Sequence, residues 1–246
     1  MMLKNSVHFV LQGKGGVGKS LAASFLAQYF AEKNIGPVIS VDTDPVNATF
    51  SKYKSLNVAH VDITDGARIN ERKFDAVIER MATNEGIFVV DNGAATFLPL
   101  TSYMAENSVF EVLASTGKSV YVHSILTAGQ GFNDTVNGFA EIVERVDTNA
   151  KIVLWLNEFW GKVEVDGNPF TATKLFKQAA QKVAGVVRVE QRNPDTFGAD
   201  VRLMTEKHQT FADIEAGGGF DMMAKLRLNK VRQSVAAELD GVKWDE

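Results

Sequence analysis

Eight residues near the N-terminus carry the clearest chemical signal in the chain. Residues 13–20 read Gly-Lys-Gly-Gly-Val-Gly-Lys-Ser. Glycines lack a Cβ atom, so several backbone N–H groups of such a loop can point inward together at an anion, and a helix beginning after the loop directs its positive end to the same place. The second lysine can then reach the β- and γ-phosphates, while the hydroxyl after it can ligate Mg²⁺. The sequence therefore predicts a nucleotide-binding loop made of Gly13, Gly15, Gly16, Val17, Gly18, Lys19 and Ser20.

Three carboxylates follow at the ends of later apolar segments. Asp42 and Asp44 close one such segment, and Asp91 closes another. The carboxyl ends of parallel strands meet at one edge of a sheet, beside the phosphate loop, where carboxylates can support Mg²⁺ and orient an attacking water. Asp91 ends a short apolar run, a pattern typical of the carboxylate that holds Mg²⁺ through its water shell. Gly93 is expected to offer its backbone N–H to the γ-phosphate.

Strands and helices must alternate to position these groups. Continuous apolar runs predict strands, and apolar residues spaced three and four apart predict helices between them. Strands alternating with helices indicate an α/β fold, here the three-layer α/β/α sandwich of a P-loop NTPase with a mostly parallel central sheet. The predicted strands are 6–11, 37–42, 86–91, 119–125, 151–156 and 186–190, with 58–64 as an edge strand, and the predicted helices are 19–33, 69–83 and 130–146.

One compositional break suggests how the chain is divided. Gly217-Gly218-Gly219 precedes a helical pattern over about 220–239. We expect an ATPase domain over residues 1–216, followed by a glycine-rich hinge and a C-terminal helix over 217–246. This helix would pack on the same domain or extend from it.

Composition limits the chemistry further. The chain has 246 residues, a formal net charge of −4 and no cysteine. Without cysteine there is no disulfide, thiolate metal site, iron–sulfur cluster or cysteine nucleophile. No leader-like segment or long apolar stretch is present, so the expected location is the cytoplasm.

Lys14 narrows the class of nucleotide-binding protein, because an ordinary phosphate loop does not require a lysine at its second position. The loop resembles the deviant one of the ParA/MinD superfamily. That resemblance implies a homodimer in the ATP state, with Lys14 acting as a catalytic cation on the partner's phosphates, together with Lys19. The string Asp42-Thr43-Asp44-Pro45 resembles the family's first switch. It implies that Asp44 positions water and that Asp42 joins Asp91 and Ser20 around Mg²⁺.

The nucleotide base is the next inference from this resemblance. Asn157 stands where the superfamily places an asparagine that reads adenine, and its amide offers one donor and one acceptor face. The lysine and aspartate that GTPases carry after this position are missing from Asn157-Glu158-Phe159-Trp160. The resemblance therefore implies ATP, with Mg²⁺, as the bound nucleotide.

A narrower resemblance covers nearly the whole chain. The segments Pro45-Val46-Asn47-Ala48-Thr49-Phe50 and Asp91-Asn92-Gly93-Ala94 are similar to those of the TraL proteins of conjugative plasmids, with plasmid-stability ATPases of the StbB type as relatives. This implies an ATPase, slow and stimulated by a partner, that works with plasmid transfer or partition proteins.

Two alternative functions stay open at this stage. A positioning ATPase resembling MinD would contact the membrane periphery through its C-terminal helix, although the acidic chain end suits anionic lipid poorly. A synthetase resembling dethiobiotin synthetase would transfer phosphate to a metabolite. Non-specific DNA binding is a further candidate role of the same helix, through Lys225, Arg227, Lys230 and Arg232.

Overall fold

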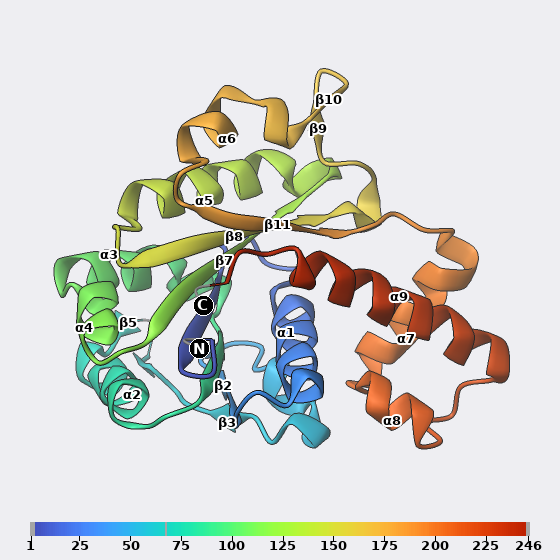
Figure 1. Ribbon diagram of the computed structural model, residues 1–246, viewed down its shortest axis with the longest axis horizontal. Helices are drawn as coiled ribbons and strands as arrows, with labels where there is room; N and C mark the ends of the chain where they lie inside the picture. The colour runs from blue at the N-terminus through green and yellow to red at the C-terminus, as the bar shows by residue number, and fades with distance from the viewer. Residues whose placement is uncertain (1–2, 67, 245–246) are drawn as a thin grey trace.

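A seven-stranded sheet forms the centre of the computed structural model, which describes residues 3–66 and 68–244. Its strand order is β11-β8-β7-β1-β6-β2-β3, and all neighbouring pairs are parallel (Figure 1). The strands are β1 (Ser6–Leu11), β2 (Val38–Asp42), β3 (Ala59–His60), β6 (Ile87–Asp91), β7 (Ser119–Thr127), β8 (Ala150–Asn157) and β11 (Val183–Val189). The mostly parallel sheet predicted from the sequence is confirmed. Of the expected edge strand at 58–64, only β3 joins this sheet.

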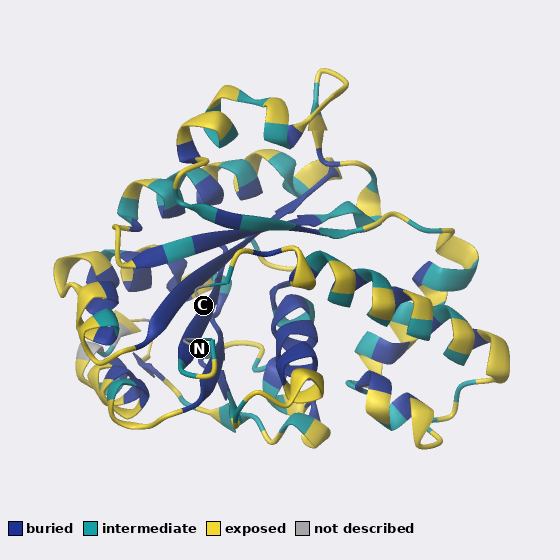
Figure 2. Cartoon of the chain, in the orientation of Figure 1, coloured by how far each residue is buried: buried dark blue, intermediate teal, exposed yellow. Residues whose placement is uncertain are grey.

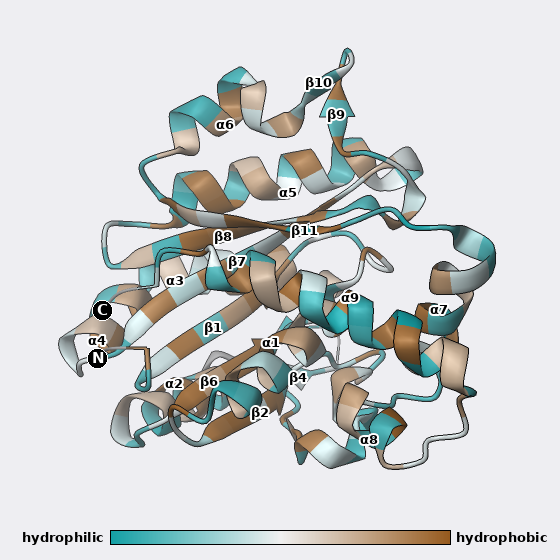
Figure 3. Ribbon diagram, turned by 45° about the vertical axis from the view of Figure 1, so that its right-hand side comes forward, coloured by the Kyte–Doolittle hydropathy of each residue, from teal (hydrophilic) through white to brown (hydrophobic). Residues whose placement is uncertain are grey.

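Helices cover both faces of the sheet, which explains why its central strands are apolar on both sides. On one face lie α2 (Glu71–Thr83), α3 (Phe97–Glu106), α4 (Val109–Ser115), α5 (Phe132–Arg145) and α6 (Lys174–Ala179). On the other lie α1 (Lys19–Lys33), α7 (Ala199–Glu206), α8 (Phe211–Glu215) and α9 (Met222–Asp240). Figure 3 shows hydrophobic colour concentrated on the strands and on the helix faces turned toward them. The predicted three-layer α/β/α sandwich is confirmed.

Two short antiparallel hairpins lie outside the main sheet. One pairs β4 (Thr64–Asp65) with β5 (Arg68–Ile69), and the other pairs β9 (Glu164–Val165) with β10 (Asn168–Pro169). The second projects from the body of the molecule beside α6 (Figure 1). Neither hairpin pairs with a strand of the main sheet.

Helix α9 packs on the same layer as α1. One side of the helix is buried against the sheet and neighbouring helices, whereas its other side is exposed (Figure 2). The buried residues are Ala224, Leu228, Val231, Val235 and Leu239. After the helix, the backbone N–H of Lys243 donates to the Ala184 carbonyl of β11. Gly185 permits this close approach, because a Cβ atom there would lie 2.9 Å from Val242 Cα. Among the described residues, no helix is both long and apolar enough to cross a membrane.

A buried chain of polar side chains crosses the sheet face beneath Trp244. The Trp155 indole N–H donates to His123 Nδ1 over 2.9 Å, and His123 Nε2 lies 3.0 Å from His8 Nδ1. His8 Nε2 lies 2.9 Å from the Ser6 hydroxyl, which donates to the Leu3 carbonyl. An indole can only donate, so each histidine is a neutral imidazole with its proton on Nε2. The chain is satisfied only while both rings are uncharged.

Burial keeps these rings neutral and makes stability depend on pH. It lowers the pKa of His123 to about 3, and burial together with His123 lowers the pKa of His8 well below its ordinary value. In the unfolded chain each histidine takes up a proton below about pH 6.5, whereas in the folded protein it stays neutral. The contribution of the two histidines to the free energy of unfolding is therefore complete above about pH 6.5 and is lost as the pH falls toward the pKa of the folded state. For His123 the loss amounts to about 1.4 kcal/mol per pH unit.

The variant His123→Gln isolates this effect, since buried carboxyls such as Asp91 titrate equally in both proteins. Its deficit in unfolding free energy relative to the wild type should shrink by about 1.4 kcal/mol between pH 7.5 and pH 5.5. Urea denaturation at the two pH values measures the deficit. The matched variant His60→Gln, at an exposed position, should show no such change. A deficit for His123→Gln that stays constant with pH would contradict the assignment.

Candidate nucleotide-binding site

A cavity of about 720 Å³ opens at the carboxyl edge of the sheet. Loop 13–20, between β1 and α1, forms its floor, and the segments after β2, β6 and β8 form its inner walls. Helix α7 closes the outer side. The cavity thus brings together the phosphate loop and the strand ends that were predicted from the sequence. Its lining includes Gly15, Gly16, Gly18, Lys19, Ser20, Asp44, Ala94, Asn157, Phe159, Trp160 and Arg202.

The loop has the backbone geometry that an anion-binding cradle requires. Gly16 and Gly18 have φ angles of 73° and 101°, in the left-handed region that glycine adopts without strain. Helix α1 begins at Lys19 with no acidic residue in its first turn and no side-chain cap. Its free N–H groups and positive dipole end therefore face the cavity.

Lys19 lies buried within the loop. Its ammonium donates to the Lys14 carbonyl over 3.1 Å. Burial lowers its pKa, while the carboxylates of Asp91 and Asp44 act in the opposite direction. Lys19 is therefore a cation held next to the loop, and the nearby carboxylates of Asp91 and Asp44 partly balance its positive charge.

Gln12 anchors the loop, a role that the sequence does not reveal. Its amide nitrogen donates to the carbonyls of Ile125 in β7 and Thr135 in α5, and its amide oxygen accepts from Gly13 N–H over 2.8 Å. A Cβ atom at Gly138 of α5 would lie 1.9 Å from this oxygen, so only glycine fits there. The first residue of the loop is thus fixed by contacts from elements more than a hundred residues away.

Asp91 and Asp42 lie side by side in the register of β6 and β2 but differ in their bonding. Both carboxylate oxygens of Asp42 accept backbone N–H groups, from Asp44 over 3.0 Å and from Ser51 over 2.8 Å. Asp42 therefore holds the segment after β2 in place. Within the described residues, Asp91 Oδ1 is buried without a hydrogen-bond partner, which leaves it available to a ligand.

The electrostatics of Asp91 fit a position beside a cation. Its pKa is raised to about 7, mainly by burial and also by the carboxylates of Asp42 and Asp44, while a hydrogen bond with Ser20 and the charge of Lys19 act in the opposite direction. A metal ion beside Oδ1 would favour the ionised form. No group of three or more His, Cys, Asp or Glu in the described part of the chain could hold a metal on its own.

Asp44 organises the segment that follows it. Its Oδ1 accepts from the backbone N–H of Val46 over 2.9 Å and of Asn47 over 3.1 Å. A Cβ atom at Gly93 would lie 2.9 Å from the same oxygen, so glycine permits close contact between the segments after β2 and β6. Asp44 and Gly93, each predicted to serve the site, therefore lie in contact, and Asp44 lines the cavity.

Lys14 points away from its own cavity. Its ammonium forms an ion pair of 2.7 Å with Asp134 in the first turn of α5, and both side chains are exposed. The pair borders a second hollow of about 570 Å³, lined also by Gly13, Phe97 and Leu98. Lys14 thus lies on the open face of the molecule, on the other side of the loop from Lys19.

Asn157 is brought to the cavity, and its amide is partly used there. The nitrogen donates to the Val17 carbonyl of the loop over 2.9 Å, and the oxygen accepts from Phe159 N–H over 3.3 Å. A Cβ atom at Gly18 would lie 2.9 Å from this nitrogen, so the contact depends on glycine. Asn157 joins the end of β8 to the phosphate loop, a tertiary contact that the sequence alone does not predict.

Two aromatic side chains form part of the cavity lining. Phe159 and Trp160 belong to the short helix Glu158–Trp160 that follows Asn157. The guanidinium of Arg202 in α7 lies 5.9 Å from the centre of the Phe159 ring. Aromatic faces and a guanidinium suit a flat, electron-rich ring such as a nucleobase.

The basic residues of α9 lie outside the cavity lining. Arg227 forms an ion pair of 2.5 Å with Asp200, and Arg232 pairs with Glu32 over 3.0 Å and with Glu215 over 2.6 Å. Half of the basic set predicted to contact DNA is therefore neutralised within the protein.

Comparisons with known proteins agree with this geometry. No protein-family model matches the chain. Two proteins of Escherichia coli, each named Protein TraL, are 40% and 38% identical to it over 234 residues, covering 95% of this chain and 97% of each relative.

Two solved structures have a fold similar to that of this chain. The MinC:MinD cell division protein complex of Aquifex aeolicus matches with a TM-score of 0.52 and 12% identity, over 98% of both chains. A ParA family ATPase from Chlorobium tepidum matches with a TM-score of 0.53 and 13% identity, over 96% of this chain and 99% of that one. At these identities the likeness concerns the fold, which is the P-loop NTPase fold of MinD and ParA proteins. The identity to the two Escherichia coli proteins over nearly its whole length shows that the chain belongs to the TraL family.

Proposed function

We propose that the protein is an ATPase that switches between monomer and homodimer as it binds and hydrolyses Mg·ATP. One observation supports this most strongly. A glycine loop with left-handed residues and an uncapped helix N-terminus lines the cavity together with the cation of Lys19. Asp91, whose Oδ1 has no hydrogen-bond partner among the described residues, is buried next to Ser20 and Lys19. Backbone N–H groups with a cation bind phosphates, and a free carboxylate oxygen beside a hydroxyl suits Mg²⁺.

The residues present fit a magnesium ion that is shared with the nucleotide. Mg²⁺ is commonly held by one or two protein oxygens, with phosphate oxygens and waters completing its octahedron. Ser20 and Asp91 would supply the protein side, and Asp42 would support the site by holding the segment after β2. The ion would neutralise charge on the phosphates during hydrolysis.

The base and the attacking water have candidate partners as well. Adenine would lie toward Phe159, Trp160 and Arg202, with Asn157 at its edge. Asp44, at the junction of the segments after β2 and β6, would orient the water. Gly93 would face the γ-phosphate, so loss of that phosphate would loosen both segments.

Lys14 and three exposed apolar side chains support a homodimer. Val46, Leu98 and Trp160 follow the carboxyl ends of β2, β6 and β8, and all three are exposed at the same edge of the sheet. Lys14 lines a hollow together with Leu98, and it cannot serve its own site while it pairs with Asp134. In a face-to-face dimer Lys14 would reach the partner's phosphates, and the apolar groups would be buried.

The variant Asp44→Asn tests the water-positioning role. An amide oxygen can still accept from Val46 and Asn47, so the local turn should persist, whereas the negative charge that orients and polarises water is removed. We expect hydrolysis to slow by about 10²- to 10⁴-fold, while ATP still forms the dimer. Single-turnover phosphate release and size-exclusion chromatography measure the two properties. Turnover at the wild-type rate would remove Asp44 from this role.

Phosphate release decides between this proposal and the synthetase alternative. Purified protein with Mg·ATP alone should release inorganic phosphate, at a rate lowered by EDTA. Strict dependence of turnover on an added metabolite would instead favour a phosphoryl-transferring synthetase. The cellular task that we propose, conjugal transfer or stability of a plasmid in the cytoplasm, is supported by the TraL family.

A further inference from the structure

Helices α7 and α9 pack against each other in the layer that also holds α8 (Figures 1 and 3). The Asp200–Arg227 ion pair joins the start of α7 to the second turn of α9. At the other end, the ammonium of Lys207 lies 5.3 Å from the centre of the Phe220 ring, just before α9 begins. Leu203 lies between Asp200 and Lys207 in the sequence, so these two contacts bring its part of α7 close to the start of α9.

Apolar side chains gather on the outer side of this helix pair. Among the described residues nine large apolar side chains are exposed, and four of them belong to α7 and the first turns of α9. We call these four the α7–α9 patch: Leu203, 38% exposed, Met222, 78%, Met223, 51%, and Leu226, 48%. Single exposed apolar residues are ordinary, whereas a cluster on one surface indicates a contact site. Methionine is flexible and polarisable, and it is common on surfaces that bind amphipathic helices.

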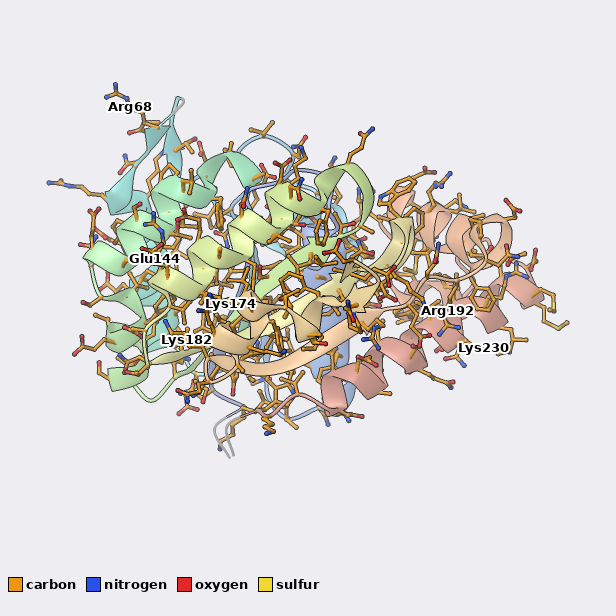
Figure 4. The ribbon with its side chains drawn as sticks, turned by 90° about the horizontal axis from the view of Figure 1, so that it is seen from above. Arg68, Glu144, Lys174, Lys182, Arg192 and Lys230 are labelled. Atoms are coloured by element: carbon orange, nitrogen blue, oxygen red, sulfur yellow. The ribbon has the colours of Figure 1, made fainter. Side chains whose placement is uncertain are left out.

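The charges around the patch are predominantly positive. Three basic side chains border it, Lys207 directly after α7 and Lys225 and Lys230 on α9, and none forms an ion pair within the described part of the chain. Lys230, labelled in Figure 4, extends from α9 in line with Met222 and Leu226, at successive intervals of four residues. Two acidic residues, Glu206 and Asp221, lie beside them.

The pattern of these charges distinguishes between occupants. A uniformly anionic surface would lie against Glu206 and Asp221 as well as against the lysines. A discrete helix can place its acids opposite the lysines and its apolar residues on the methionines, leaving both carboxylates in water. The patch therefore fits an acidic amphipathic helix better than a lipid surface.

We infer that the α7–α9 patch is a docking site for an acidic amphipathic helix of a partner protein. Such a helix would bury its apolar residues on Met222, Met223 and Leu226, and its carboxylates would pair with Lys225 and Lys230. The site needs no nucleotide, so it stands independently of the ATPase proposal. Arg227 and Arg232, which are paired inside the protein, take no part in it.

Fluorescence anisotropy tests the inference with two labelled peptides of about 18 residues, long enough for helix formation. Both have leucines at helical spacing, one with glutamates and the other with lysines on the polar face. Full-length protein without nucleotide should bind the acidic peptide at least about tenfold tighter than the basic one. The variant Met222→Ser/Leu226→Ser should weaken acidic-peptide binding by about tenfold or more.

Matched variants distinguish binding at the α7–α9 patch from non-specific hydrophobic binding. Ile35→Ser and Val112→Ser remove apolar groups of similar exposure elsewhere, 38% and 43%, and should change affinity by less than about twofold. The charge reversal Lys225→Glu/Lys230→Glu should invert the preference between the peptides.

Three outcomes would overturn the inference. The first is no measurable binding of the acidic peptide, and the second is a loss of binding in the control variants as large as that in the patch variant. In the third, vesicles of phosphatidylcholine and phosphatidylserine would bind the wild type but not the patch variant, without peptide binding, which would assign the patch to a membrane.

Discussion

Replacing Lys19 by alanine should abolish tight nucleotide binding. The ammonium lies buried in the loop, 3.1 Å from the Lys14 carbonyl, and is the cation nearest to where the β- and γ-phosphates would lie. A hydrogen bond to a charged group contributes about 1.5–3 kcal/mol, so loss of two such bonds should weaken ATP binding by at least about 100-fold. Isothermal titration calorimetry with a slowly hydrolysed ATP analogue measures the affinity.

The control for Lys19→Ala is Lys54→Ala, which removes an exposed lysine from the segment after β2. This variant should bind nucleotide with the wild-type affinity. Loss of affinity in both variants would point to a general charge effect. Retained affinity in Lys19→Ala would place the phosphates somewhere other than loop 13–20.

Replacing Lys14 by alanine should have a different effect, because this side chain faces away from its own cavity. The monomer should bind ATP as the wild type does, whereas hydrolysis should fall by about 10³- to 10⁵-fold, the range found for cations supplied in trans. The ion pair between Lys14 and Asp134 is exposed and contributes about 0–1 kcal/mol to stability. Breaking it when the dimer forms would therefore cost little free energy. Binding by calorimetry and phosphate release under single-turnover conditions separate the two effects.

The variant Asp134→Asn provides the matched comparison. It breaks the same ion pair but keeps the lysine, so activity should be retained. If Asp134→Asn and Lys14→Ala lost activity equally, the ion pair itself would be required, and the cation would have no separate role. A fully active Lys14→Ala would end the proposal that this lysine acts on the partner's phosphates.

The phosphate loop and the strand ends were predictable because the features that define them are local. Glycines, lysine and serine of residues 13–20 are contiguous, and Asp42 and Asp91 end apolar runs that are easily recognised as buried strands. Parallel pairing then brings the strand ends together without further information. The structure places both carboxylates in register, as that reasoning requires.

Contacts between distant residues could not be predicted in this way. Gln12 with Gly138, Asn157 with Val17, and Lys14 with Asp134 each join elements whose relative position depends on the whole fold. The neutralisation of Arg227 and Arg232 in α9 also depends on distant acids, so counting basic residues overestimated the charge available to DNA.

Short helices were missed for a different reason. α7 and α8 have eight and five residues, too few to show a clear helical period. α3 begins Phe97-Leu98-Pro99, and proline within a first turn is compatible with a helix, although it reads as a break in sequence. The cavity wall formed by α7 was consequently absent from the predicted site, together with Arg202.

Size-exclusion chromatography with light scattering tests the proposed switch most directly. Mass would be measured without nucleotide, with Mg·ADP and with Mg²⁺ plus a slowly hydrolysed ATP analogue. A nucleotide-controlled dimer predicts the monomer mass in the first two conditions and twice that mass with the analogue. A mass that is identical in all three conditions would contradict the account.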